Sequence, residues 1–201
     1  TMGPQNYLLA QLAYDPLQDG DVLLADYFRR GFGPAADAVR AYFTMLEEAH
    51  SRFVEWDGFV TGGNYYRPGI AVFPRLYTDA FLGEAEALLD AADAQAEGSP
   101  DVYRQRIAFV RAGLAFTRLQ VRIMQAMKRV RESEGRDTEA VRAAGDLCGQ
   151  RTRLFQSAPP FALDGPRIEN HIRIRKMQDY LGPPSPELRQ AAQTPYDPDL
   201  D

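Results

Sequence analysis

The chain has 201 residues, and its 45% hydrophobic and 25% charged residues are typical of one well-packed globular domain. Its 28 acidic and 23 basic side chains give a formal net charge of −5, which argues against sequence-independent binding to nucleic acid or anionic membranes. One cysteine and two histidines exclude an intrachain disulfide and a multi-cysteine or histidine-rich metal centre. We therefore expect a soluble protein with no metal, no cofactor, no nucleic acid partner and no membrane span.

Residues 1–54 carry apolar side chains at helical spacing, which predicts three helices. The first lies between Pro4 and Pro16, because proline disfavours helix in the residue before it. The second is short and ends at Gly31, and the third is amphipathic and continues to Phe53. This segment is therefore predicted to be helical almost throughout.

Residues 55–77 lose this periodicity and mix aromatic side chains with glycine and proline. We expect a long aromatic loop with a short extended stretch over residues 69–73. Its rings are suited to stacking on sugars while polar neighbours bind hydroxyl groups, although they could instead merely cover one end of the bundle. The candidate substrate-binding residues are Trp56, Asn64, Tyr65, Tyr66 and Arg67.

Residues 78–193 are predicted to form the rest of a helical bundle, followed by a polar tail over residues 194–201. The run Ser99-Pro100-Asp101 gives the strongest start signal, because it supplies a cap, a first-turn proline and an acid near the helix N-terminus. The predicted helices cover residues 78–98, 99–134, 138–158 and 164–182. The chain is thus expected to be a single all-α domain, a bundle of about seven helices with one long central helix.

The sequence contains no phosphate-binding glycine loop, nucleophile elbow or HExxH pair. The acid pairs at 47–48 and at 90 and 93 are more typical of solvated helix surfaces than of catalytic sites. His50 is either a site residue or a hydrogen-bonded neighbour of the aromatic loop, and Cys148 is interpreted as a small buried hydrophobe. One basic cluster could bind an anion, but pairing with acids of neighbouring helices is favoured: Arg167, His171, Arg173, Arg175 and Lys176. We predict no catalytic residue.

Three short segments near the N-terminus carry a resemblance. They read GPQNYLLAQLAYDP over residues 3–16, DVLLADYF over 21–28 and GFGPAA over 31–36. They resemble the C-terminal part of large bacterial glycoside-hydrolase-like proteins of the domain of unknown function 4838 family, which are distantly similar to α-glucuronidases and β-N-acetylhexosaminidases. The likeness covers residues 3–50, and Tyr14 stands where the family more often has tryptophan.

This resemblance implies that the chain is the C-terminal helical domain of a longer bacterial enzyme, an expectation with which the start at Thr1 agrees. In such enzymes a catalytic (β/α)8 barrel precedes the domain, and the two catalytic carboxylates come from strand ends that this chain lacks. We therefore expect a domain that is not catalytic alone. Its implied partners are carbohydrate and the barrel of the same polypeptide, in either the cytoplasm or a secreted protein.

The alternative is a free-standing helical module that binds a protein partner or a second copy of itself. It predicts a stable 22.5 kDa protein that is made as such and forms dimers. The hydrolase-domain hypothesis instead predicts that apolar residues of the first two helices are left partly exposed without the barrel: Leu8, Leu12, Leu23 or Tyr27.

Overall fold

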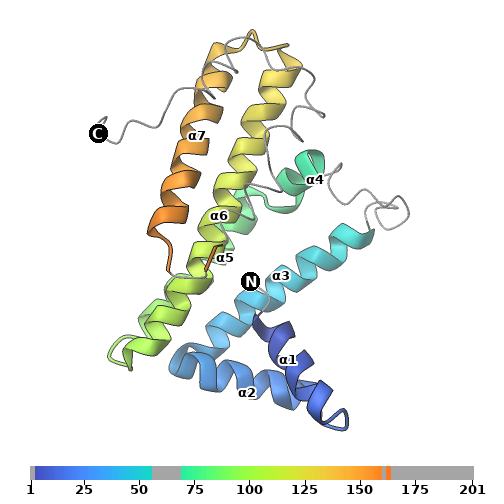
Figure 1. The fold of residues 1–201 in the computed structure, drawn as a ribbon, viewed down its shortest axis with the longest axis vertical. Coiled ribbons are helices and arrows are strands. Elements are labelled where there is room, and N and C mark those ends of the chain that lie inside the picture. Colours follow the sequence, from blue (N-terminus) through green and yellow to red (C-terminus); the bar gives the residue numbers. More distant parts are fainter. Residues whose placement is uncertain (1–2, 56–68, 160–161, 164–201) are drawn as a thin grey trace. The chain divides into compact units, whose positions relative to one another are not determined.

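The computed structural model describes residues 3–55, 69–159 and 162–163, and every regular element within them is a helix (Figure 1). The predicted all-α class is therefore confirmed. None of the described helices is both long enough and apolar enough to cross a membrane.

The chain divides into two compact units, which are described separately. Unit 1 comprises Thr1–Trp56 and Asp79–Leu114, and unit 2 comprises Asp57–Thr78 and Ala115–Asp201. Unit 1 contains α1 (Gly3–Tyr14), α2 (Gly20–Phe32), the 3-10 helix η1 (Gly33–Ala35), α3 (Ala36–Glu55), α5 (Asp79–Gln95) and the first part of α6 (Asp101–Glu132). Unit 2 contains α4 (Gly69–Leu76), the rest of α6 and α7 (Thr138–Ser157).

Helix α2 is fixed at both ends by local interactions. Its N-cap residue Asp19 accepts hydrogen bonds from the backbone N–H groups of Asp21 and Val22, which have no partner inside the helix. At the other end the N–H of Gly33 donates to the carbonyl of Arg29, and Gly33 has a positive φ of 54°. Glycine adopts this conformation without strain, so the chain can turn from α2 into η1 and α3 within one residue.

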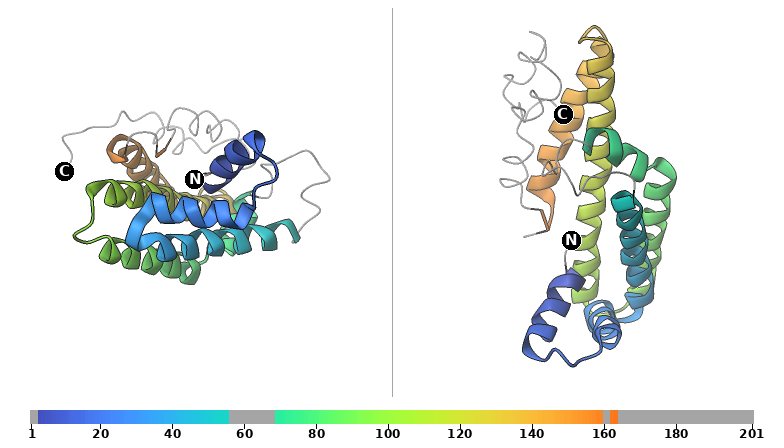
Figure 2. Two further views of the ribbon diagram at one scale, coloured as in Figure 1. Left: turned by 90° about the horizontal axis from the view of Figure 1, so that it is seen from below. Right: turned by 90° about the vertical axis from the view of Figure 1, so that its right-hand side faces the viewer.

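The core of unit 1 lies among α3, α5 and α6. Val39, Leu89 and Ile107, one on each of these helices, are fully buried. Alanines on α3 and α5 are fully buried as well: Ala49, Ala85 and Ala92. Because alanine adds little bulk, the backbones of α3 and α5 can approach closely, and the two helices pack side by side (Figure 2).

In unit 2, the second part of α6 and helix α7 form an antiparallel pair. The rings of Phe116 and Phe155 stack at one end of the pair, with centroids 5.9 Å apart. At the other end the N–H of Gly135 donates to the carbonyl of Val130 and closes α6, and Asp137 then caps α7 through the N–H of Ala140 at 2.8 Å. A small apolar cluster fills the seam between the two helices: Ile123, Ala126, Met127 and Ala144, with Leu147 and Cys148 packed against it.

The structure corrects one local prediction. Residues 69–73, expected to be extended, belong to helix α4, so that prediction was wrong. Phe73 and Tyr77 stand four residues apart, and their rings pack at 5.9 Å while the N–H of Tyr77 donates to the carbonyl of Phe73. This spacing of aromatics is a helix signal, but the proline at position 74 obscured it. The helix predicted over residues 164–182 lies outside the described residues. The predicted division of the chain into residues 1–54, 55–77, 78–193 and 194–201 stays a prediction.

The backbone at Gly33 gives a first testable prediction. A Cβ atom there would lie 2.6 Å from the ring of Tyr103 and would also require a disfavoured φ. We expect Gly33→Ala to destabilise the chain by about 1–3 kcal/mol. The control is Gly83→Ala inside α5, where a Cβ meets nothing within 4 Å, and this change should stabilise by about 1 kcal/mol. Urea unfolding measures both, and equal effects of the two substitutions would contradict the account.

Candidate functional site

The structure leaves the predicted substrate-binding residues untested. All five lie outside the described residues: Trp56, Asn64, Tyr65, Tyr66 and Arg67. The basic cluster over residues 167–176 also lies outside them. The sugar-binding role of these side chains therefore stays a prediction.

The structure describes several of the other residues that the sequence singled out. Asp90 and Asp93 both accept from Nη2 of Arg111, at 2.9 and 2.5 Å. His50 lies on α3 with an exposed side chain. Cys148 is half-buried in unit 2, and burial raises the pKa of its thiol, so it is a protonated, unreactive packing residue at neutral pH. Within the described part of the chain, no three or more His, Cys, Asp or Glu side chains are grouped to hold a metal ion.

A cavity of about 350 Å³ in unit 1 is the best candidate for a functional site. This volume is at the lower end of the range of small-molecule pockets. Helices α1, α2, α3 and α6 all contribute to its wall. The lining residues are Gly3, Tyr7, Tyr27, Arg30, Gly31, Phe32, Phe43, Arg106, Phe109 and Val110.

Half of the ten lining residues are aromatic. The rings of Tyr7 and Tyr27 pack with centroids 5.4 Å apart, which joins α1 to α2. Tyr27 also meets Phe32 edge-on at 6.1 Å, and behind this layer Phe28 packs against Phe43 of α3 at 5.8 Å. Each of these pairs lies in the range of favourable aromatic contacts. These ring contacts join α1, α2 and α3 at the wall.

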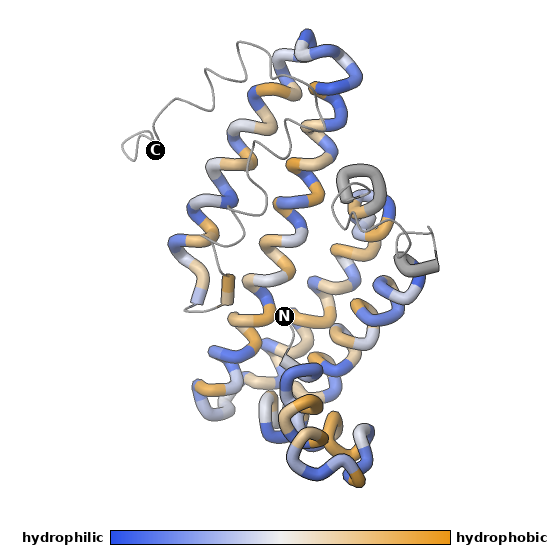
Figure 3. The backbone as a smooth tube through the Cα atoms, turned by 45° about the vertical axis from the view of Figure 1, so that its right-hand side comes forward, coloured by the Kyte–Doolittle hydropathy of each residue, from blue (hydrophilic) through white to orange (hydrophobic). Residues whose placement is uncertain are grey.

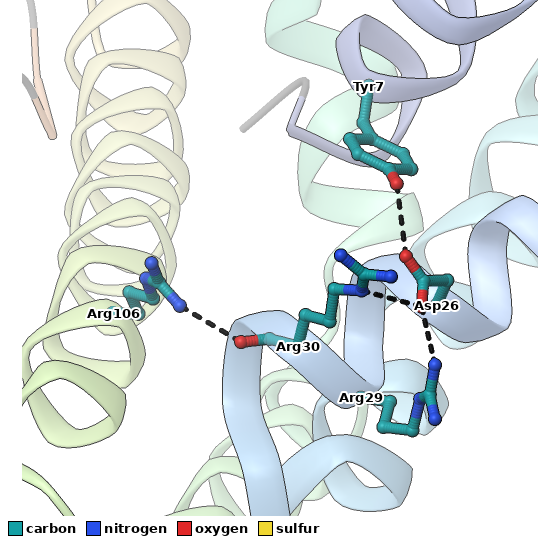
Figure 4. Close-up of polar contacts among 5 residues, drawn as sticks. All are labelled: Tyr7, Asp26, Arg29, Arg30 and Arg106. Carbon is teal, nitrogen blue, oxygen red and sulfur yellow. Dashed lines mark hydrogen bonds and ion pairs between the residues drawn. The ribbon is translucent and has the colours of Figure 1, made fainter.

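Asp26 organises the polar edge of the site (Figure 4). Its Oδ1 atom accepts from Nη2 of Arg29 at 2.6 Å and from Nε of Arg30 at 2.8 Å. Its Oδ2 atom accepts from the hydroxyl of Tyr7 at 3.2 Å. These bonds, that from Arg29 first and that from Arg30 second, hold the pKa of the Asp26 carboxyl below its ordinary value. The carboxylate therefore fixes both the Tyr7 hydroxyl and the Arg30 guanidinium beside the cavity.

Arg106 supplies a second guanidinium from α6. Its Nη1 donates to the carbonyl oxygen of Arg30 at 3.2 Å (Figure 4). It also donates to the carbonyl oxygen of Gly31 at 2.9 Å, so it binds the last turn of α2. A positive charge is favourable there, because carbonyls at a helix C-terminus lack partners and the helix dipole is negative. Within the described part of the chain, the Nη2 and Nε groups of Arg106 have no acceptor, and no acid pairs with it.

Tyr27 lies where the two arginines and the aromatic wall meet. Burial raises the pKa of its phenol, and the nearby positive charge of Arg106 opposes that shift only partly. The hydroxyl is therefore protonated at neutral pH and can donate a hydrogen bond. A Cβ atom at position 3 would collide with this hydroxyl, so Gly3 lets α1 begin directly above Tyr27.

Sequence reasoning assigned Tyr7 and Tyr27 to apolar helix stripes and missed this site. The spacing of Asp26, Arg29 and Arg30 at i, i+3 and i+4 predicts the ion pairs, but surface pairs of that kind are common on helices. Arg106 stands 75 residues beyond the carbonyl of Gly31 that it binds, so no local signal could have found it.

Comparison with known proteins finds no matching family model, no matching curated protein and no matching solved structure.

The electrostatics of Asp26 give a testable prediction. Because its pKa is lowered in the folded state, its contribution to stability is present at neutral pH and is lost as the pH falls through the folded-state pKa. The Arg29→Gln, Arg30→Gln double variant should raise the titration midpoint of the Asp26 carboxyl toward its ordinary value. Carbon-13 NMR of the side-chain carboxyl measures that midpoint, and an unchanged midpoint in the variant would show that these arginines do not cause the shift.

Proposed function

We propose that the chain is a non-catalytic helical domain of a bacterial carbohydrate-active glycoside hydrolase, which packs against the catalytic barrel of the same polypeptide. Four exposed apolar side chains on α1, the turn after it and the start of α2, together termed the apolar surface, support this proposal most directly. Its members and their exposed fractions are Leu9 at 67%, Tyr14 at 92%, Leu17 at 93% and Val22 at 65%. Figure 3 shows the hydrophobic stretches of this part of the backbone. Leu9, Tyr14 and Val22 lie within the segments that carry the family resemblance, and Leu17 lies between two of them.

The pattern of α1 explains why this surface exists. Leu8 and Leu12 are half-buried, as is Tyr27 of α2, whereas Leu23 is buried and Leu9 is exposed. Successive residues of a helix point about 100° apart, so Leu8 and Leu9 cannot both face the same neighbour. A helix that is apolar on more than one side is typical of burial from more than one side. Covering one exposed leucine contributes about 1.5–3 kcal/mol, which would favour a docked state.

A charge placed on this surface tests the proposal. In the complete gene product, Leu17→Glu should lower the free energy of unfolding by about 2 kcal/mol, because it would bury a carboxylate at the domain contact. In the 201-residue chain alone, the same change should be nearly neutral, since Leu17 is exposed there. The control is Val102→Glu on α6, an exposed position outside the apolar surface, which should be nearly neutral in both proteins. Thermal and urea unfolding measure the effects, and tolerance of Leu17→Glu in both proteins would contradict the docking role.

The alternative function, a free-standing interaction module, uses the same surface in another way. If two copies cover it, the 201-residue chain is a dimer and Leu17→Glu converts it to a monomer. Analytical ultracentrifugation of the two proteins separates this outcome from docking on a barrel.

The carbohydrate part of the proposal concerns Trp56, Asn64, Tyr65, Tyr66 and Arg67, whose composition suits stacking on sugar rings. Trp56 is the single tryptophan of the chain, so its fluorescence reports on this segment alone. Titration of the 201-residue chain with uronates, N-acetylhexosamines and oligosaccharides should shift or quench the Trp56 emission. Emission that stays unchanged with all three ligand classes would count against a sugar contact by this segment.

A further inference from the structure

The cavity of unit 1 has the chemistry of a binding site, and none of its described lining residues comes from the predicted aromatic segment over residues 55–77. We infer that it binds a small monocarboxylate whose charged group is attached to an apolar ring. The inference depends on the size of the cavity, on its wall and on the charges at its edge, and each of these restricts the ligand.

Size and wall restrict the body of the ligand. A cavity of about 350 Å³ admits a small molecule rather than a polymer segment or a helix. Tyr7 and Tyr27 meet at 5.4 Å, and Phe109 and Val110 of α6 also line the space. Aromatic faces and edges favour a flat or cyclic apolar partner, because rings stack on one another or meet edge to face.

The charged residues at the edge of the cavity restrict the head group of the ligand. Arg30 and Arg106 line the cavity, and none of the described lining residues is acidic. The Nε of Arg30 already donates to the Asp26 carboxylate, which also accepts from Arg29. Arg106 binds only backbone carbonyls, so in the described part of the chain it is the lining cation whose charge no acid balances. These positive charges favour an anionic head group over a neutral or cationic one.

Hydrogen-bond geometry favours a carboxylate in particular. The Nη1 group of Arg106 is held by the carbonyls of Arg30 and Gly31, which leaves Nη2 and Nε to donate. These two groups form one planar edge of the guanidinium, and that edge matches the two oxygens of a carboxylate. The half-buried Tyr27 phenol, which also lines the cavity, adds a neutral donor that can bind the same head group. Arg106 thus has two roles, closing the last turn of α2 and binding the ligand.

Titration of the complete 201-residue chain with benzoate tests this inference, with benzamide as the neutral ligand of the same shape and acetate as the anion without a ring. We expect chemical-shift changes at Tyr7, Gly31 and Arg106 and affinity at least about fivefold higher for benzoate than for either control. Binding of benzamide or acetate as tightly as benzoate would overturn the inference, as would the absence of benzoate binding.

Variants on α6 separate recognition from a general charge effect. Arg106→Gln should weaken benzoate binding at least about fivefold, whereas Arg104→Gln should change it less than about twofold. Arg104 is the control because it lies on the same helix, pairs with Asp101 and does not line the cavity. Both substitutions remove one positive charge. Because Arg106→Gln also removes the bonds to α2, Arg106→Lys serves as a second variant that keeps the charge but loses the planar edge. Arg106→Lys should bind benzoate more weakly than the original chain while its melting temperature stays unchanged. An equal loss of benzoate affinity in the Arg104 and Arg106 variants would contradict the site.

Discussion

The hydrogen bonds from Arg106 to the carbonyls of Arg30 and Gly31 fix the corner on which unit 1 depends. They satisfy acceptors at the end of α2 that no helical N–H can reach, and they place α6 against that end. Three residues earlier on the same helix, Tyr103 fills the space above Gly33, where the positive φ turns the chain into η1. One face of α6 therefore packs against the turn that joins the local C-cap of α2 to η1. The cavity lies beside this corner, so its wall is set by the same contacts.

Helix α1 connects the two surfaces that carry functional proposals. Tyr7 faces the cavity, where its ring packs on Tyr27 and its hydroxyl binds Asp26. Leu9, two residues along, is 67% exposed and belongs to the apolar surface proposed to meet a catalytic barrel. Because the two residues lie on one short helix, a partner that covers Leu9 would also fix the position of Tyr7. Docking and ligand binding are in that case linked through α1.

The positions of the helices were largely predictable from sequence, because local signals decide them. The run Ser99-Pro100-Asp101 marks a helix start, and the structure begins α6 at Asp101. Helix α4 was missed because a proline within a short segment outweighed its i, i+4 aromatic pair. The candidate site could not be predicted, because it depends on contacts such as that of Arg106 with Gly31, which join residues distant in sequence. The residues assigned to sugar binding from composition alone lie in segments that the structure does not describe.

The central claim is that this helical chain functions as part of a longer carbohydrate-active enzyme. The most direct test is the intact mass of the protein isolated from its source, read together with the coding DNA upstream of the Thr1 codon. The account predicts a mass well above 22.5 kDa and an upstream region in which strands and helices alternate, with acidic residues at strand ends. A native mass of about 22.5 kDa would contradict it and would favour the free-standing interaction module.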